Sequence, residues 1–142
     1  MKTVQQIIAT KPKIIHAVNG ETPVFDALKI MMDKNISALM IMDGDLLTGI
    51  FSERDYARKV ILLGRSSKTA LIQEVMTPNP ITVSPSDSID HCMMLMTNKH
   101  IRHLPVVKDS KVVAMLSIGD IVKYIIEDQK QTISQLENYI RQ

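Results

Sequence analysis

The chain has no tryptophan, a single cysteine and few aromatic residues, which make up 4% of its 142 residues. So few aromatics provide no stacking platform for single-stranded nucleic acid. The net charge of +2 provides no strongly basic surface either. The lone Cys92 excludes an internal disulfide and fits a reducing compartment. We therefore expect a cytoplasmic protein with no nucleic-acid partner.

Long apolar runs are also lacking. No stretch approaches the roughly 20 residues of a membrane span, and residues 1–9 contain no apolar segment of signal-peptide length. The five glycines are scattered and form no phosphate-binding loop. His100 and His103 fall at a strand start, where alternation sends their side chains to opposite faces. The sequence therefore predicts a protein that is not an enzyme. It also predicts no membrane partner, no metal site and no catalytic cofactor.

What the chain does contain is an internal repeat with a constant offset of 65 positions. Each copy reads as β-α-β-β-α, so we predict an α+β (α/β) fold in which two repeats pack as a pseudo-two-fold pair. The expected boundaries are 3–63 for the first repeat, 64–70 for a linker, 71–127 for the second repeat and 128–142 for a C-terminal helical extension. The matched pairs are Val18 and Val83, Ala27 and Cys92, Met31 and Met96, Ile36 and Ile101, Leu39 and Leu104, Ile50 and Met115, Ser52 and Ser117, and Asp55 and Asp120.

Helix and strand signals locate the elements of the first repeat. We expect a short helix over 3–9, a strand over 14–18, and a helix with Thr22 as N-cap and Pro23 at its first position. Asn35 is a plausible end for that helix, and a hairpin turn is predicted at 43–45. In the second repeat the matching first strand is expected over 80–83.

Two strand-to-helix corners carry the most specific signal. In each, an apolar run ends in a serine and an aspartate follows three residues later, as Ser52 with Asp55 (the first corner) and Ser117 with Asp120 (the second corner). The serine then caps a helix, where free backbone N–H groups gather. The same arrangement can hold a polar ligand. The pattern alone leaves both interpretations open.

The tail of the chain is predicted to be a helix with an apolar stripe. It continues past the point at which the corresponding helix of the first repeat ends near Gly64. Such a stripe needs a surface to cover, either on its own body or on a second chain. The stripe comprises Ile125, Ile133, Leu136, Tyr139 and Ile140.

These patterns together resemble the paired CBS domain, named after cystathionine β-synthase. The resemblance rests on five segments in the family's order. They are residues 22–28 (TPVFDAL) and 49–55 (GIFSERD) in the first repeat, and 76–83 (MTPNPITV), 101–107 (IRHLPVV) and 117–120 (SIGD) in the second. The resemblance implies a stand-alone, bacterial-type regulatory module, also called a Bateman module.

The family resemblance implies adenosine-containing ligands in two clefts between the repeats: AMP first, with ADP, ATP, NAD(H) or S-adenosylmethionine as the other candidates. The serine and aspartate of each corner are expected to hold the ribose hydroxyls, for which a carboxylate and a hydroxyl are suited. The starts of the first and second strands of each repeat are expected to face the base and phosphate. The residues assigned in this way are Ser52, Asp55, Ser117, Asp120, His16, Thr77, Ile81, Ser37, Ala38, Arg102 and His103.

The two clefts are not expected to be equivalent. Arg102 and His103 are suited to a phosphate, and Arg54 lies inside the first corner only. The family also commonly forms flat homodimers, in agreement with the apolar tail. The alternative is an adaptor protein with vestigial clefts, whose C-terminal helix docks on a partner. The effector protein is not identified by the sequence.

Overall fold

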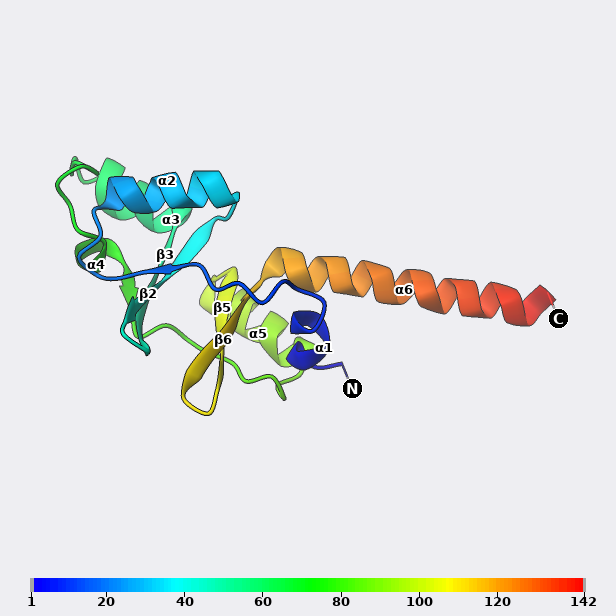
Figure 1. Ribbon diagram of the computed structural model, residues 1–142. Helices are drawn as coiled ribbons and strands as arrows, with labels where there is room; N and C mark the ends of the chain where they lie inside the picture. Colours follow the sequence, from blue (N-terminus) through cyan, green and yellow to red (C-terminus); the bar gives the residue numbers. More distant parts are fainter. Residues whose placement is uncertain (1, 142) are drawn as a thin grey trace.

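The computed structural model describes residues 2–141 and consists of two lobes from which one long helix projects (Figure 1). The first lobe contains a four-stranded sheet of order β1-β2-β3-β4, in which only the β1–β2 pair is parallel. The second contains the antiparallel hairpin β5-β6, with Val83 bridging to Val106 in parallel. The strands are β1 (Ala17–Val18), β2 (Ala38–Asp43), β3 (Leu46–Ser52), β4 (Thr77–Pro78), β5 (His103–Lys108) and β6 (Lys111–Ser117).

The helices repeat as the strands do, which confirms the mixed α and β class. Helices α2 and α5 both end at a left-handed residue, Asn35 with φ 53° and His100 with φ 55°. Both hairpins also carry a register shift at the same offset, after Ile41 and after Val106. The helices are α1 (Val4–Ile8), α2 (Val24–Lys34), α3 (Glu53–Tyr56), the π-helical turn η1 (Ala57–Ile61), α4 (Ile72–Val75), α5 (Ile89–Lys99) and α6 (Ile118–Arg141).

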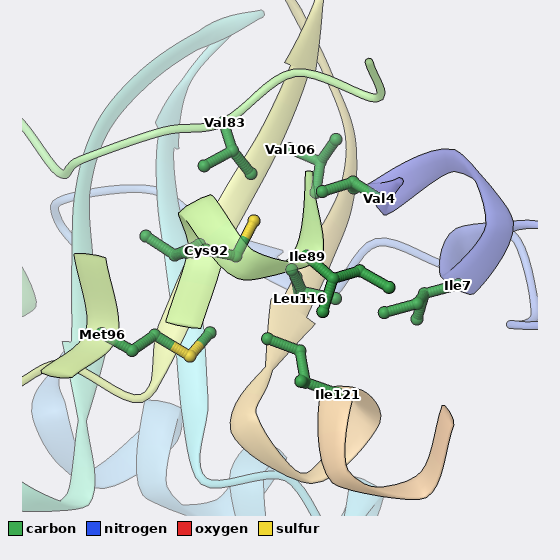
Figure 2. Packing of buried hydrophobic residues seen from close by; sticks show 10 residues of the cluster. Val4, Ile7, Val83, Ile89, Cys92, Met96, Val106, Leu116 and Ile121 are labelled. Carbon is green, nitrogen blue, oxygen red and sulfur yellow. The ribbon is translucent and has the colours of Figure 1, made fainter. Parts of the chain in front are cut away.

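The two lobes exchange their first helices. Val4 and Ile7 of α1 are buried in the core of the second lobe, among Ile89, Cys92 and Leu116 (Figure 2). The backbone N–H of Val4 also donates to the carbonyl of Asp87 at 2.9 Å. Each buried aliphatic side chain contributes about 1.5–3 kcal/mol. The N-terminal segment is therefore anchored on the second repeat.

Helix α4 makes the reciprocal exchange. Its Ile72 and Val75 are buried with Val24 and Phe51 in the core of the first lobe. Each repeat therefore completes the core of the other, and the chain crosses between the lobes in the segments 9–16 and 76–82. We call the first of these segments the N-terminal connector. The two connectors pass close to the two corners.

Three of the expected elements are wrong in detail. The strand expected over 14–18 is limited to β1, because residues 14–16 still belong to the connector that crosses between the lobes. Pro23, not Thr22, is the N-cap residue of α2, because its extended backbone (φ −60°, ψ 143°) keeps it outside the helix. The Thr22 hydroxyl instead reaches the side chain of Asn19 at 3.4 Å. The strand expected over 80–83 is reduced to the bridge at Val83, because Asn79 turns the chain with φ 49° and Pro80 has no N–H to donate.

Helix α6 continues without interruption from Ile118 to Arg141, as the tail pattern predicted. Its first turns lie on the second lobe, where Ile121 is fully buried, and the rest extends away from both lobes (Figure 1). Within residues 2–141, no helix combines the length and the apolar character needed to cross a membrane.

Candidate functional site

Both corners are closed capping boxes. In the first, the Ser52 N–H donates to the Asp55 carboxylate at 2.9 Å, and the Asp55 N–H donates back to the Ser52 hydroxyl at 3.2 Å. In the second, the corresponding distances between Ser117 and Asp120 are 2.9 and 3.1 Å. Each box satisfies N–H groups that a helix start leaves without an intrahelical partner. The capping interpretation therefore holds at both corners, and ligand binding depends on what else surrounds each aspartate.

The first corner is covered by β4. The other carboxylate oxygen of Asp55 accepts the Thr77 hydroxyl at 3.1 Å and lies 3.4 Å from the ammonium of Lys59. Asp55 is buried as a result. The carboxylate that would hold a ribose is thus already engaged by protein donors on both oxygens.

Gly49 allows this covering strand to approach. It pairs with Pro78 across the β3–β4 ladder, and a Cβ built on it would lie 3.0 Å from the Thr77 carbonyl and 2.3 Å from the sulfur of Met76. A Cβ at this position would therefore displace the Met76 side chain and press against the Thr77 carbonyl of β4. The matching residue of the second corner is Ala114, which already carries a Cβ.

The second corner opens into a cleft of about 780 Å³. Three segments meet there: the N-terminal connector, the start of β2, and the end of the β5–β6 hairpin. The cleft therefore draws on both repeats and mixes residues that the sequence assigned to separate halves. The predicted site residues that line it are His16, Ser37, Ala38, His103, Ser117 and Asp120.

Lys11 also lies in this cleft, and sequence reasoning missed it. Its ammonium group donates to the Asp120 carboxylate at 2.7 Å and to the Met115 carbonyl at 2.6 Å. Burial alone would raise the pKa of Asp120, but hydrogen bonds from Lys11 and Ser117 more than offset this and lower it. The sequence signal at this position is the Lys-Pro-Lys triplet at 11–13, whose proline is typical of the end of a helix.

His103 joins the two repeats across the cleft. Its Nε2 lies 2.9 Å from the Ser37 hydroxyl, which comes from the other repeat. Burial is the main cause that lowers the pKa of His103, and Lys11 and Arg102 act in the same direction while Asp120 opposes them. A neutral imidazole in this position can donate a hydrogen bond to a ligand or accept one from it.

The remaining predicted residues lie outside this cleft. Arg54 donates from its guanidinium to the His100 carbonyl at 2.9 Å, which ties the first corner to the end of α5. Arg102 and Ile81 are exposed, and Thr77 belongs to β4. Of the three cations that we expected to bind phosphate, His103 lines this cleft, whereas Arg54 and Arg102 do not. Among residues 2–141, no group of three or more His, Cys, Asp or Glu side chains has a metal-binding arrangement.

Comparison with known proteins identifies the class to which this fold and site belong. The model of the CBS domain family matches residues 4–61 and 72–127, one copy for each repeat. The chain belongs to the CBS domain family.

Individual relatives support the assignment along most of the chain. A mitochondrial CBS domain-containing protein of Arabidopsis thaliana, CBSX3, is 40% identical over 123 residues, which cover 83% of this chain and 60% of that protein. A solved structure of a protein with CBS domains from Burkholderia ambifaria MC40-6 is 48% identical, with a TM-score of 0.87 over 90% of this chain and 96% of that chain. The CBS domain pair of protein MJ0100 was solved with 5′-methylthioadenosine and S-adenosyl-L-methionine. It is 28% identical, with a TM-score of 0.77 over 87% of this chain and 99% of that chain.

Proposed function

We propose that this chain is a non-catalytic regulatory module that binds an adenosine-containing ligand in the cleft at the second corner. The observation that carries the proposal is the meeting of Asp120 and Ser117 with His16, Ser37 and Ala38 around a cavity of about 780 Å³. This volume falls in the range of about 300–1,000 Å³ that is usual for small-molecule sites. The adenosine ligands bound by the MJ0100 domain pair support the ligand class.

The chemistry of the cleft suits a nucleoside moiety. The Asp120 carboxylate can accept both hydroxyls of a ribose, and the Ser117 hydroxyl can donate or accept beside it. Ile14 and Ile15 of the N-terminal connector line the cleft with exposed apolar side chains, which offer a surface for a base. AMP is the first candidate, with ADP, ATP, NAD(H) and S-adenosylmethionine as the others.

Signalling follows from the construction of the cleft out of both repeats. A ligand that touches His16 and Ser37 on one side and Asp120 on the other binds best at one particular spacing of the lobes. It therefore favours that arrangement over others by its difference in affinity. The first corner takes a ligand less readily, because Thr77 and Lys59 must first release Asp55.

A titration of wild type and Asp120→Ala tests the proposal. Purified protein is titrated calorimetrically with AMP, ATP, NAD⁺ and S-adenosylmethionine, and thermal stability is recorded in parallel. At a hundredfold excess over the dissociation constant, a bound ligand should stabilise the fold by about 2.7 kcal/mol. Asp120→Ala should abolish this response and keep the fold. Asp33→Ala, which removes an exposed carboxylate from α2, is the matched control.

Two results would decide against nucleotide sensing. Wild type that responds to none of the four ligands would favour the adaptor function, in which the clefts are vestigial. If Asp120→Ala binds the ligand with wild-type affinity, Asp120 does not bind the ribose.

We also infer that two copies of the chain pair through α6. Five of its exposed apolar residues recur at alternating spacings of three and four, with Gln129 in register between them. This is the heptad pattern of a two-stranded coiled coil, and isoleucine occupies one of its two core positions in three successive heptads. The apolar members are Val122, Ile126, Ile133, Leu136 and Ile140, all at least 46% exposed.

Sedimentation of wild type and Ile133→Glu tests the pairing. The variant places a charge in the middle of the apolar interface between the two α6 helices. Its dimer dissociation constant should therefore rise more than about a hundredfold. Gln131→Glu adds the same charge on the outer face of α6 and should leave the dimer unchanged. Wild type that sediments as a monomer at all concentrations would contradict pairing and leave the helix free for another partner.

A further inference from the structure

We propose that Lys11 makes the open cleft select adenosine ligands that carry a phosphate. In the structure its ammonium group donates to the Asp120 carboxylate. When ribose hydroxyls take that place, the ammonium turns to the phosphate of the same ligand. This inference rests on the proposed adenosine-binding function and specifies which ligands of that class the cleft prefers.

The first observation is that the Lys11 side chain already contacts Asp120, the residue proposed to bind the ribose. It reaches Asp120 across 109 positions of sequence, with its ammonium 2.7 Å from one carboxylate oxygen. A second bond of 2.6 Å to the Met115 carbonyl fixes its position. The Lys11 side chain is 30% exposed and that of Asp120 is 23% exposed. Both are thus accessible from the cleft, and a ribose that binds Asp120 must displace or share this lysine.

The second observation is the charge balance of the cleft. Among the described residues that line it, Asp120 is the only carboxylate, whereas Lys11 and Lys13 are both present. Once ribose hydroxyls occupy the Asp120 oxygens, Lys11 has no other anionic partner among the lining residues. Its ammonium group then keeps only the Met115 carbonyl and water as partners, and the favourable charge pair is lost. A ligand that supplies its own anion removes this cost.

The third observation is that the exchange needs only side-chain movement. The backbone of the N-terminal connector is anchored by α1 in the core of the second lobe and by the His16 carbonyl, which accepts the Met40 N–H at 3.4 Å. Lysine carries its charge on a flexible four-carbon stem. Its ammonium can therefore turn within the cleft while the connector stays in place.

This arrangement separates ligands that share the adenosine moiety. AMP offers both the ribose for Asp120 and the phosphate for Lys11. Adenosine offers only the ribose, so it leaves Lys11 unpaired. S-adenosylmethionine carries a sulfonium and an ammonium group beside its single carboxylate, so its net charge is positive and adds to the existing positive charge of the cleft. The expected order of affinity is therefore AMP, then adenosine, with S-adenosylmethionine disfavoured relative to AMP.

The test is the ratio of the adenosine and AMP dissociation constants, measured by calorimetry for wild type and Lys11→Met. Methionine has a similar length and no charge. Adenosine should bind more tightly to Lys11→Met, because nothing has to be displaced from Asp120, whereas AMP should bind more weakly. The preference for AMP should fall by about tenfold, or about 1.4 kcal/mol. Lys11→Arg should retain most of the preference.

Lys2→Met is the matched control. Lys2 belongs to the same N-terminal region and pairs with Asp128 on α6 at 3.1 Å, so its loss changes the net charge equally without touching the cleft. The control should keep the wild-type preference for AMP. An equal fall in both variants would reduce the effect to net charge and overturn the inference.

The outcomes also separate this inference from the proposed function. If wild type binds both ligands and the ratio of the adenosine and AMP dissociation constants is the same in Lys11→Met, the role of Lys11 is refuted. Nucleotide binding itself then stands. A Lys11→Met variant that loses affinity for both ligands equally shows a merely structural lysine and refutes it as well. Wild type that binds neither ligand contradicts the proposed function itself.

Discussion

The first and second corners share one four-residue capping box, yet they differ in what approaches the aspartate. At the first, β4 lies against β3 and the short side chain of Thr77 reaches Asp55 directly. At the second, the N-terminal connector passes without pairing to β6, and only the long side chain of Lys11 spans the distance to Asp120. The comparison teaches that the capping box alone does not define a binding site. The neighbouring connector decides whether the carboxylate is accessible.

Residues 49 and 114 explain much of this difference. Gly49 leaves room for a strand to lie directly against β3, and the Thr77 carbonyl occupies the space that a Cβ would need. Ala114 fills the corresponding space at the second corner and lines the cleft. The space beside residue 49 is therefore one feature that distinguishes the covered edge from the open one.

Replacement of Gly49 by valine should produce the largest effect. Valine is a good strand former, so any loss of stability reports the clash with β4 rather than strand propensity. The free energy of unfolding should fall by about 1–3 kcal/mol, as is usual for overpacking. Urea denaturation followed by circular dichroism measures it. The opposite change at the other corner, Ala114→Gly, should cost only about 0.5–1 kcal/mol. Equal losses at both positions would contradict the role assigned to Gly49.

Replacement of the two aspartates should also destabilise the first corner more than the second, but by less than the Gly49 replacement does. Asp55→Ala leaves the Thr77 hydroxyl and the Lys59 ammonium without their partner and removes a helix cap, so it should cost about 2 kcal/mol. Asp120→Ala removes the corresponding cap, but its partner Lys11 is accessible to water, so the cost should be about 1 kcal/mol. Thermal denaturation of the two variants measures both values. A larger loss for Asp120→Ala would contradict the assignment of the first corner as covered and the second as open.

The sequence could predict the elements that depend on local pattern. The 65-residue repeat, the hairpin turn around Gly44 and the capping boxes all follow from residue type and spacing, and each is present. The strand at 77–78 and the exchange of α1 and α4 depend on which segments meet in space. No pattern within one repeat encodes these pairings. For the same reason Lys11 could not be connected with Asp120 from sequence alone.

The response to acid should provide the smallest and most local difference between the corners. Burial lowers the pKa of His103 below its ordinary value of 6.5, so the unfolded chain binds a proton there before the folded one does. Stability is therefore lost as the pH falls from about 7 toward 5. The lowered pKa of Asp120 adds a second loss, which begins only below about pH 4. His103→Gln keeps a polar partner for Ser37 and should flatten the first decline in urea denaturation between these pH values. His91→Gln, at an exposed position of α5, should retain it. An unchanged decline in His103→Gln would mean that the cleft histidine does not contribute to the acid response.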